Sequence, residues 1–246
     1  MAELGFAAVP DAARYILAGA TVPGVLLDAP GMEPDADGLA HVDIAVADGV
    51  VAAIGPAGTF GGDAARLDLG RSMVWPTFVD MHTHLDKGHI WPRRPNPDGT
   101  FMGALDAVAA DRAANWSADD VRRRMDFSLR SAYAHGTSLV RTHLDSIAPQ
   151  YRISWPVFAE MRERWAGRIE LQAVSIVGVD ELRDTAYADD LADTVAAHGG
   201  VLGCVTYMVP GLEEIVEAVM RRAMDRGLDL DLHVDESGDP EARSLR

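Results

Sequence analysis

The chain has 246 residues, a formal net charge of -16 at pH 7 and 48% hydrophobic residues. This apolar share is enough to bury a sizeable core, whereas the strong negative charge opposes binding to nucleic acid or to an anionic membrane surface. The single cysteine, Cys204, excludes an internal disulfide and a cysteine-based zinc cluster. No export signal and no long apolar run is visible, so we expect a folded cytoplasmic protein, built as one large barrel or as two unequal domains.

Residues 1–73 consist of short apolar stretches separated by Gly, Pro and Asp, which is typical of a small β unit. Two strand-like runs within it meet at Asp48 and Gly49. This dipeptide readily adopts the positive φ angles of a tight turn, so we expect a hairpin there.

From residue 74 the pattern changes to strands that alternate with helices. The expected strands are 74–82, 137–144, 169–177, 201–208 and 228–234. A helix is expected from the Ser117 cap to about His135, with further helices around 153–166, 186–198 and 211–226. Strands that recur after amphipathic helices indicate parallel βαβ units.

A doubly wound open sheet and a (β/α)₈ barrel both satisfy this pattern. The first strand is followed by no Gly-rich turn of the kind that a dinucleotide-binding fold needs, so the barrel is favoured. Five strands are visible where a barrel has eight. We therefore expect either an open sheet or a chain that stops before the barrel is complete.

The end of the first strand carries the clearest chemical signal. In FVDMHTHLDK, alternate residues of a strand lie on one face, so His82 and His84 point the same way. Two imidazoles so arranged can converge on one metal ion. The alternative is a pair of histidines without a ligand, which is the commoner fate of an isolated His-x-His.

The fifth strand ends in LHVDES, where His233 is followed by Glu236. The histidine can ligate a metal while the carboxylate beyond it reaches a water molecule and acts as a general acid and base. On this segment alone, a buried strand histidine and a solvated acid are an equally good interpretation.

A fourth histidine, His143 in RTHLD, ends the second strand and can contact substrate or support a ligand histidine. Asp86, Lys87 and Trp91, in the long segment after the first strand, are further candidates for substrate contact or for support of the ligands. This segment is a candidate substrate lid. Cys204 is expected in the core rather than as a nucleophile.

Taken together, PTFVDMHTHLDK, RTHLD, LQAVSIVG and LHVDES, in that order and after a small β unit, resemble the cytosine deaminase-like branch of the amidohydrolase superfamily. The resemblance implies a metal-dependent-hydrolase (β/α)₈ TIM barrel. About the first five βα units would lie in residues 74–246, with the metal site, and the N-terminal half of a small β-sandwich domain in residues 1–73.

The resemblance also implies roles for particular residues. His82, His84 and His233 would bind one divalent metal ion, zinc or iron, and Glu236 would move the proton. Two further ligands of the family, a histidine and an aspartate on later strands, would fall beyond Arg246. The glutamine with which cytosine deaminases read a pyrimidine falls on Gly178, so a substrate other than cytosine is expected.

The expected function is hydrolytic deamination of an amino-substituted nitrogen heterocycle by metal-activated water. Hydrolysis of another C–N bond, in a cyclic amide or an N-substituted amine, uses the same ligands and stays open. So does a truncated chain without activity of its own. The expected partner is a small-molecule substrate, with a homo-oligomer possible and neither nucleic acid nor membrane involved.

Overall fold

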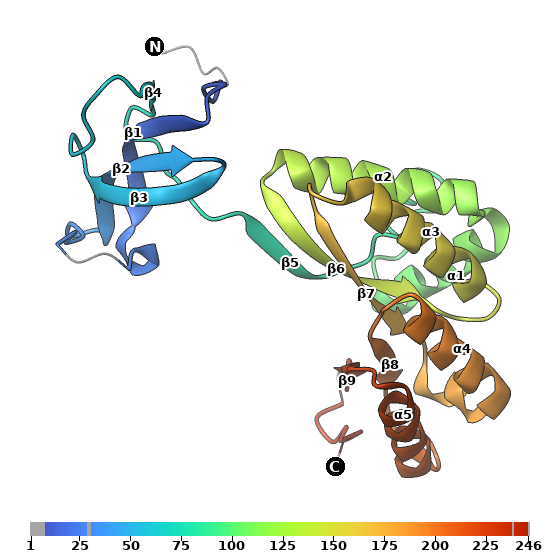
Figure 1. Cartoon of the computed structure of the whole chain (residues 1–246). Coiled ribbons are helices and arrows are strands. Elements are labelled where there is room, and N and C mark those ends of the chain that lie inside the picture. Colours follow the sequence, from blue (N-terminus) through green and yellow to red (C-terminus); the bar gives the residue numbers. More distant parts are fainter. Residues whose placement is uncertain (1–7, 29–30, 238, 246) are drawn as a thin grey trace. The chain divides into compact units, whose positions relative to one another are not determined.

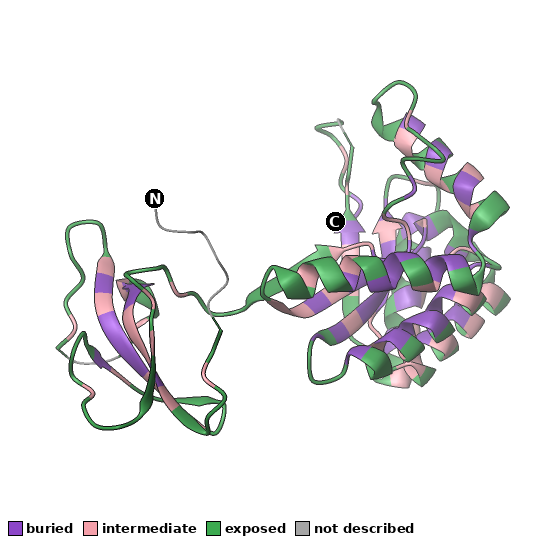
Figure 2. Ribbon diagram, turned by 90° about the horizontal axis from the view of Figure 1, so that it is seen from above, coloured by how far each residue is buried: buried purple, intermediate pink, exposed green. Residues whose placement is uncertain are grey.

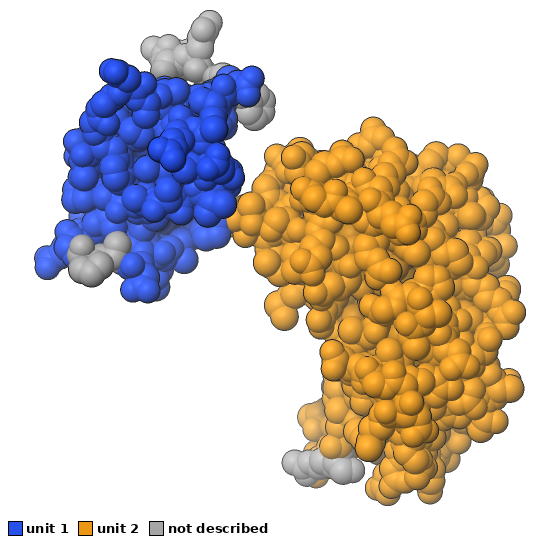
Figure 3. All heavy atoms as spheres, viewed as in Figure 1, with its two compact units in different colours: residues 1–76 blue, residues 77–246 orange. Residues whose placement is uncertain are grey.

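The computed structural model describes residues 8–28, 31–237 and 239–245. The chain divides into two compact units, Met1–Pro76 and Thr77–Arg246 (Figure 3).

The first unit is a four-stranded sheet in the order β3-β2-β1-β4 (Figure 1). Its strands are β1 (Arg14–Pro23), β2 (Leu39–Ala47), β3 (Val50–Pro56) and β4 (Ala65–Asp68), with a short 3₁₀ turn, η1 (Gly24–Leu26), after β1. β2 pairs antiparallel with β1 and β3, and β4 pairs parallel with β1. At the β2–β3 turn, Asp48 and Gly49 have φ angles of 52° and 78°, which confirms the predicted hairpin.

One face of this sheet carries a small apolar core, and a carboxylate, Asp43, is buried on the opposite face of β2. The core contains Ala20, Val22, Ala40, Val42, Ile44 and Val46. Asp43 accepts hydrogen bonds from the backbone N–H groups of Gly19 (2.9 Å) and Gly58 (3.1 Å) and from Arg66 (3.0 Å). Burial opposes ionisation of Asp43, but these donors outweigh it and keep the pKa of the carboxyl below its usual value.

The second unit alternates strands with helices. Its strands are β5 (Phe78–Thr83), β6 (Thr137–Asp145), β7 (Glu170–Ile176), β8 (Leu202–Thr206) and β9 (Leu230–Val234). Its helices are α1 (Phe101–Asn115), α2 (Ala118–Ala134), α3 (Tyr151–Trp165), α4 (Thr185–Ala197) and α5 (Leu212–Arg226), with a 3₁₀ turn, η2 (Val179–Arg183), after β7.

All pairings between these strands are parallel. β5, β6 and β7 form one ladder and β8 and β9 another. Parallel bridges from Val174 to Val201 and from Gly178 to Val205 join the two ladders, so neighbours along the chain are neighbours in the sheet. This is the α/β fold that the alternating pattern predicted, with an open sheet as expected for part of a barrel.

The main core lies between the strands and the helices that connect them. Buried and exposed residues alternate along the helices, so each helix buries one face and exposes the other (Figure 2). The largest fully buried side chains include Trp155 and Phe158 of α3. Ser117 caps α2 by accepting a hydrogen bond from the N–H of Asp120, as its sequence signature predicted.

Two local expectations differ from the structure. The first strand begins at Phe78 rather than at residue 74, because the pairing with β6 starts only where the N–H of Phe78 reaches the carbonyl of Gly136, and the preceding Pro76 has no N–H to donate. Helix α1 was not among the predicted helices. Its apolar residues Phe101 and Leu105 are exposed, so the sequence lacks the usual one-sided apolar stripe, although Thr100 caps it and it is rich in alanine.

Within the described residues, no helix combines the length and the apolar character needed to cross a membrane.

Candidate active site

Three histidines from separate strands meet at the carboxyl ends of the sheet. His82 lies near the end of β5, His143 near the end of β6 and His233 near the end of β9. One ring nitrogen from each lies within 4.8 Å of the other two, and the Nε2 atoms of His82 and His233 are 3.2 Å apart. Nitrogens that bind one tetrahedral zinc ion at ~2.0–2.1 Å stand roughly 3.3 Å from each other, so this separation suits a shared metal ion.

His143 is the most enclosed member of the group. Its side chain is 1% exposed, its ring stacks on that of His82 at 4.1 Å, and neither ring nitrogen has a hydrogen-bond partner among the described residues. Asp231 approaches Nε2 only to 3.6 Å, which is too long for a hydrogen bond. Burial, together with the neighbouring His82, lowers the pKa of His143, so the ring is neutral and its lone pair is free to accept a proton or a cation.

His84 lies beside this group but outside its closest set. Its ring centroid is 5.4 Å from that of His82 and 6.3 Å from that of His233. Its Nδ1 donates to the backbone carbonyl of His143 at 3.1 Å, which leaves Nε2 as the nitrogen able to bind a metal. Burial, and secondarily the charge of Lys87, lower the pKa of His84 to about 4, so the ring is neutral near pH 7.

Glu236 follows β9 at a sharp turn. Asp235 takes a positive φ of 52°, and its carboxylate accepts from the N–H of Ser244 at 3.1 Å, which fixes the turn. Glu236 is exposed and lines the same cavity as the histidines. The predicted site residues His82, His84, Lys87, His233 and Glu236 therefore line one cavity, and His143 is buried behind His82, whose ring it stacks on.

This cavity has a volume of about 730 Å³, within the range of pockets that take small organic ligands. Its apolar side comes from α1, through Phe101, Leu105 and Val108, and from the strand ends at Ile147, Val177 and Val205. Its polar side carries the histidines, Glu236, Tyr207 and a group formed by Lys87, Arg112 and Asp145.

The Asp145 carboxylate holds two cations on this wall. Lys87 Nζ donates to Oδ1 and Arg112 Nη1 to Oδ2, both at 2.8 Å. The backbone N–H of Asp145 donates to Asp86 Oδ2 at 2.8 Å. Sequence reasoning found Lys87 but missed Arg112 and Asp145. Arg112 lies on α1, which was not predicted, whereas the RTHLD motif at the end of β6 was an available signal for Asp145.

Asp86 and Trp91 do not line the cavity. Asp86 is fully buried beneath Asp145, and burial, with the Asp145 charge second, raises the pKa of Asp86 to about 7. Its backbone carbonyl accepts from Arg124 of α2, so Asp86 ties the loop after β5 to the scaffold. Trp91 is 64% exposed on that loop. A role of either residue in substrate contact stays a prediction.

Gly178 and Tyr207 shape the cavity between β7 and β8. A Cβ atom at Gly178 would lie 2.6 Å from the Tyr207 hydroxyl oxygen and 2.8 Å from Asp180 Oδ1, closer than such atoms approach. The Tyr207 hydroxyl donates to Asp180, which holds the ring over the glycine. The space that a side chain at 178 would occupy is therefore filled by Tyr207, a residue that sequence reasoning missed.

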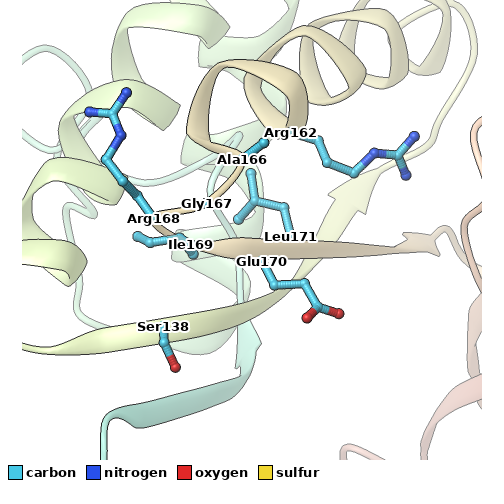
Figure 4. A pocket seen from close by; sticks show the side chains of 8 residues that line it. All are labelled: Ser138, Arg162, Ala166, Gly167, Arg168, Ile169, Glu170 and Leu171. Carbon is cyan, nitrogen blue, oxygen red and sulfur yellow. The ribbon is translucent and has the colours of Figure 1, made fainter. Parts of the chain in front are cut away.

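A second cavity, of about 500 Å³, lies at the opposite ends of the strands (Figure 4). It is lined by Ser138 near the start of β6 and by the segment from Ala166 to Leu171 that leads into β7, with Arg162 from α3. Arg162 and Arg168 extend away from each other in this view, and no histidine lines the space. Of these two cavities, only the first is lined by histidines.

Cys204 is 2% exposed within β8, and burial raises the pKa of its thiol to about 12. It is a core residue, protonated at neutral pH, which agrees with the prediction that it is not a nucleophile.

Comparison with known proteins identifies relatives of the whole chain. No protein-family model matches it. A curated pterin deaminase from Rhizobium rhizogenes is 56% identical over 241 residues, which are 98% of this chain and 55% of the relative. The chain thus spans about half the length of the curated relative it matches.

Two solved structures are similar in fold. The 5-methylcytosine deaminase from Klebsiella pneumoniae matches with a TM-score of 0.72 and 23% identity, over 94% of this chain and 53% of that one. The N-isopropylammelide isopropylaminohydrolase from Burkholderia multivorans matches with a TM-score of 0.68 and 25% identity, over 93% of this chain and 54% of that one. Both cover the first unit as well as the parallel sheet.

Proposed function

We propose, because the chain belongs to the deaminase branch of the amidohydrolase superfamily, that the complete protein is a metal-dependent hydrolase that removes the amino group from a nitrogen heterocycle. The substrate class that we propose is the pterins, fused two-ring heterocycles with an amino group between two ring nitrogens. Support comes from the curated relative, which is a pterin deaminase.

The observation that carries this proposal is the convergence of ring nitrogens in the cavity. The 3.2 Å separation of the His82 and His233 Nε2 atoms suits a shared cation more than a hydrogen bond, and the contact of His84 Nδ1 with the His143 carbonyl leaves His84 Nε2 able to bind the same ion. We assign His82, His84 and His233 as the residues that would hold one divalent ion, zinc or iron. Such an ion would supply a Lewis acid that brings the pKa of water toward neutrality.

Glu236 is the residue that we assign to proton transfer. As water adds to the ring carbon that bears the amino group, the Glu236 carboxylate accepts a proton from it. The resulting carboxylic acid then donates this proton to the amino nitrogen, the C–N bond breaks, and ammonia leaves while the ring keeps a carbonyl oxygen. One water molecule is consumed for each ammonia released, and Glu236 returns to its starting state.

The neutral rings around the site assist this role. His143 lies beside both His82 and His233 with a lowered pKa, so it adds no positive charge that would compete with a metal ion. The apolar surface of Phe101, Leu105 and Val108 provides a face on which a planar bicycle can pack and from which water is displaced.

The direct test is ammonia release from pterin by the complete, metal-loaded protein. We expect turnover with zinc or iron, loss of turnover after chelation and recovery when the metal is restored. Elemental analysis and parallel reconstitution decide between the two metals. If neither loaded form releases ammonia from pterin or from a panel of aminopyrimidines, aminopurines and aminotriazines, the proposal is wrong.

A second candidate is hydrolysis of another C–N bond, in a cyclic amide or an N-substituted amine. The similarity to the N-isopropylammelide isopropylaminohydrolase favours keeping it, since that enzyme's name describes release of an alkylamine. Product analysis separates the two, because deamination yields ammonia whereas the alternatives yield an alkylamine or a ring-opened acid.

A cytoplasmic location and a homo-oligomeric state are further parts of the proposal. The single buried cysteine is compatible with a reducing compartment. Cell fractionation tests the location, and light scattering of the complete protein tests the oligomeric state.

A further inference from the structure

One wall of the cavity carries two cations, Lys87 and Arg112, that take no part in the proton transfer by Glu236. Lys87 comes from the loop after β5 and Arg112 from α1, and they bind opposite oxygens of the Asp145 carboxylate. Each uses one N–H for this contact, although an ammonium has three donors and a guanidinium five. Neither side chain donates another hydrogen bond within the described residues. Two cations share one carboxylate, so this part of the wall is positively charged and rich in free donors.

These donors are partly shielded from water. The side chains of Lys87 and Arg112 are 22% and 17% exposed, and both line the cavity that holds the histidines. Three acidic side chains line the same cavity. Asp106 and Glu236 are exposed to solvent, and both carboxylate oxygens of Asp145 are already paired with the two cations. A hydrogen bond from a partly desolvated cation to a ligand is stronger than one made in bulk water.

We infer that Lys87 is a specificity-determining residue, which donates hydrogen bonds to an adjacent carbonyl oxygen and ring nitrogen on one edge of a bicyclic substrate. This inference rests on the proposed function and adds which edge of the substrate the protein recognises. Arg112 is the positioning residue that holds Asp145, and through it the ammonium of Lys87.

The chemistry of a pterin provides such an edge. Its 4-oxo oxygen and the N5 nitrogen of its second ring are neighbouring acceptors, like the O6 and N7 atoms of guanine that Lys and Arg side chains read in DNA. A single-ring 2-amino-4-oxopyrimidine offers the carbonyl oxygen but lacks the second acceptor. A donor placed here thus favours fused two-ring substrates over pyrimidines.

The test compares pterin with its 5-deaza analogue, in which a C–H replaces N5. Binding is measured by ligand fluorescence to the complete, metal-loaded protein carrying Glu236→Gln, so that the ligand is not consumed. The measurement is repeated with Lys87→Met, with Lys87→Arg and with the control Arg122→Gln, whose side chain pairs with Glu160 outside the cavity.

For Lys87→Met we expect pterin to bind roughly 10- to 100-fold more weakly, as for loss of charged hydrogen bonds, and the 5-deaza analogue, which keeps only the 4-oxo acceptor, to lose at least about threefold less affinity than pterin. Lys87→Arg should recover part of the pterin affinity, and Arg122→Gln should behave as the parent. Equal losses for both ligands would overturn the inference, since a structural role of Lys87 affects them alike. A comparison of the two ligands in the parent protein does not require Lys87→Met to fold. The parent should bind pterin more tightly than the 5-deaza analogue.

Chemical protection gives a second readout. Lys87 is the only lysine in the chain. Pterin should slow acylation of its ammonium at least about tenfold in peptide mass mapping, whereas the 5-deaza analogue should protect it less. Undiminished acylation at saturating pterin would contradict the contact.

The two proposals fail in different ways. If pterin binding depends on Lys87 and N5 but no ammonia is released, the proposed function is wrong and this inference stands. If ammonia is released but neither Lys87 nor N5 affects binding, the proposed function stands and this inference is wrong.

Discussion

The Nε2 atoms of His82 and His233 lie 3.2 Å apart, although 151 positions separate the two residues in the chain. Four intervening βα steps bring them together, because parallel strands end at the same edge of the sheet. The site is therefore a product of the topology, and its integrity can be tested one residue at a time.

Substitution His82→Ala or His233→Ala should lower bound metal from one equivalent to a small fraction. Each removes an imidazole from the group in which the ring nitrogens converge, and we expect metal affinity to fall by more than about 100-fold, beyond the 10- to 100-fold typical of supporting residues. Elemental analysis after gel filtration measures this. His135→Asn is the control, since the His135 ring hydrogen-bonds to the Ser131 carbonyl of α2 and does not line the cavity; full metal retention by either site variant would contradict the assignment.

Substitution Glu236→Gln should separate metal binding from chemistry. The amide keeps the size of the side chain but cannot carry a proton between water and the leaving nitrogen, so we expect kcat to fall by about 10²- to 10⁴-fold with bound metal unchanged. Steady-state ammonia release and elemental analysis give the two quantities. A variant with near-normal kcat would remove Glu236 from the mechanism.

Substitution Gly178→Ala should change substrate binding more than stability. The added Cβ meets the Tyr207 hydroxyl and the Asp180 carboxylate, the ends of two side chains, which can move at a cost of about 1 kcal/mol in unfolding free energy or less. The displaced Tyr207 ring then alters the cavity, and KM should rise severalfold. The same substitution in a Tyr207→Ala background should have little effect on KM; an equal rise in both backgrounds would rule out this steric pathway.

Acid should weaken the contact between Asp120 and its two arginines. Hydrogen bonds from Arg93, with further contributions from Arg124, lower the pKa of Asp120 to about 2. Because the folded-state pKa is lower than the unfolded value of 3.8, the stabilisation is fully present above pH 3.8 and is lost as pH falls toward 2. Its full size is on the order of 2 kcal/mol.

Urea unfolding at pH 6 and at pH 2.5 measures this effect against Asp120→Asn. The wild type should lose more stability over this range than the variant, by roughly 1 kcal/mol or more. Parallel losses in both proteins would show that other carboxylates, such as the buried Asp43, carry the acid sensitivity.

Cys204 should be unreactive in the folded protein. Its thiol is buried and its pKa is raised to about 12, so thiol reagents should modify it only after unfolding. Cys204→Ala should keep kcat within about twofold, at a cost in stability of about 1 kcal/mol for the lost packing. Rapid labelling of the native protein, or loss of turnover in Cys204→Ala, would contradict its place in the core.

The fold class followed from patterns that are local in the sequence. The strands that end in His143 and His233 and the hairpin at Asp48 are defined by alternation and turn chemistry, which act over a few residues. The convergence of the strand ends then follows from the parallel topology. For this reason the histidines and Glu236 could be expected in one place before any coordinates were considered.

The polar wall and the shape of the cavity could not be predicted in the same way. Arg112 lies on a helix whose apolar residues face the cavity, so its helical pattern is weak, and its contact with Asp145 is set by packing alone. Tyr207 belongs to the site because Gly178, on a different strand, leaves room for it. Such pairings depend on tertiary distances that no spacing in the chain encodes.

The contact between Gly178 and Tyr207 also constrains how the pocket can diverge during evolution. A side chain at 178 displaces the Tyr207 ring from the position it holds here, so a change at 178 alters the pocket as long as the tyrosine is kept. Homologues that carry a larger residue at the first position are expected to carry a smaller or redirected one at the second. A new substrate range would then arise by paired substitutions, with a less active single-substitution ancestor between them.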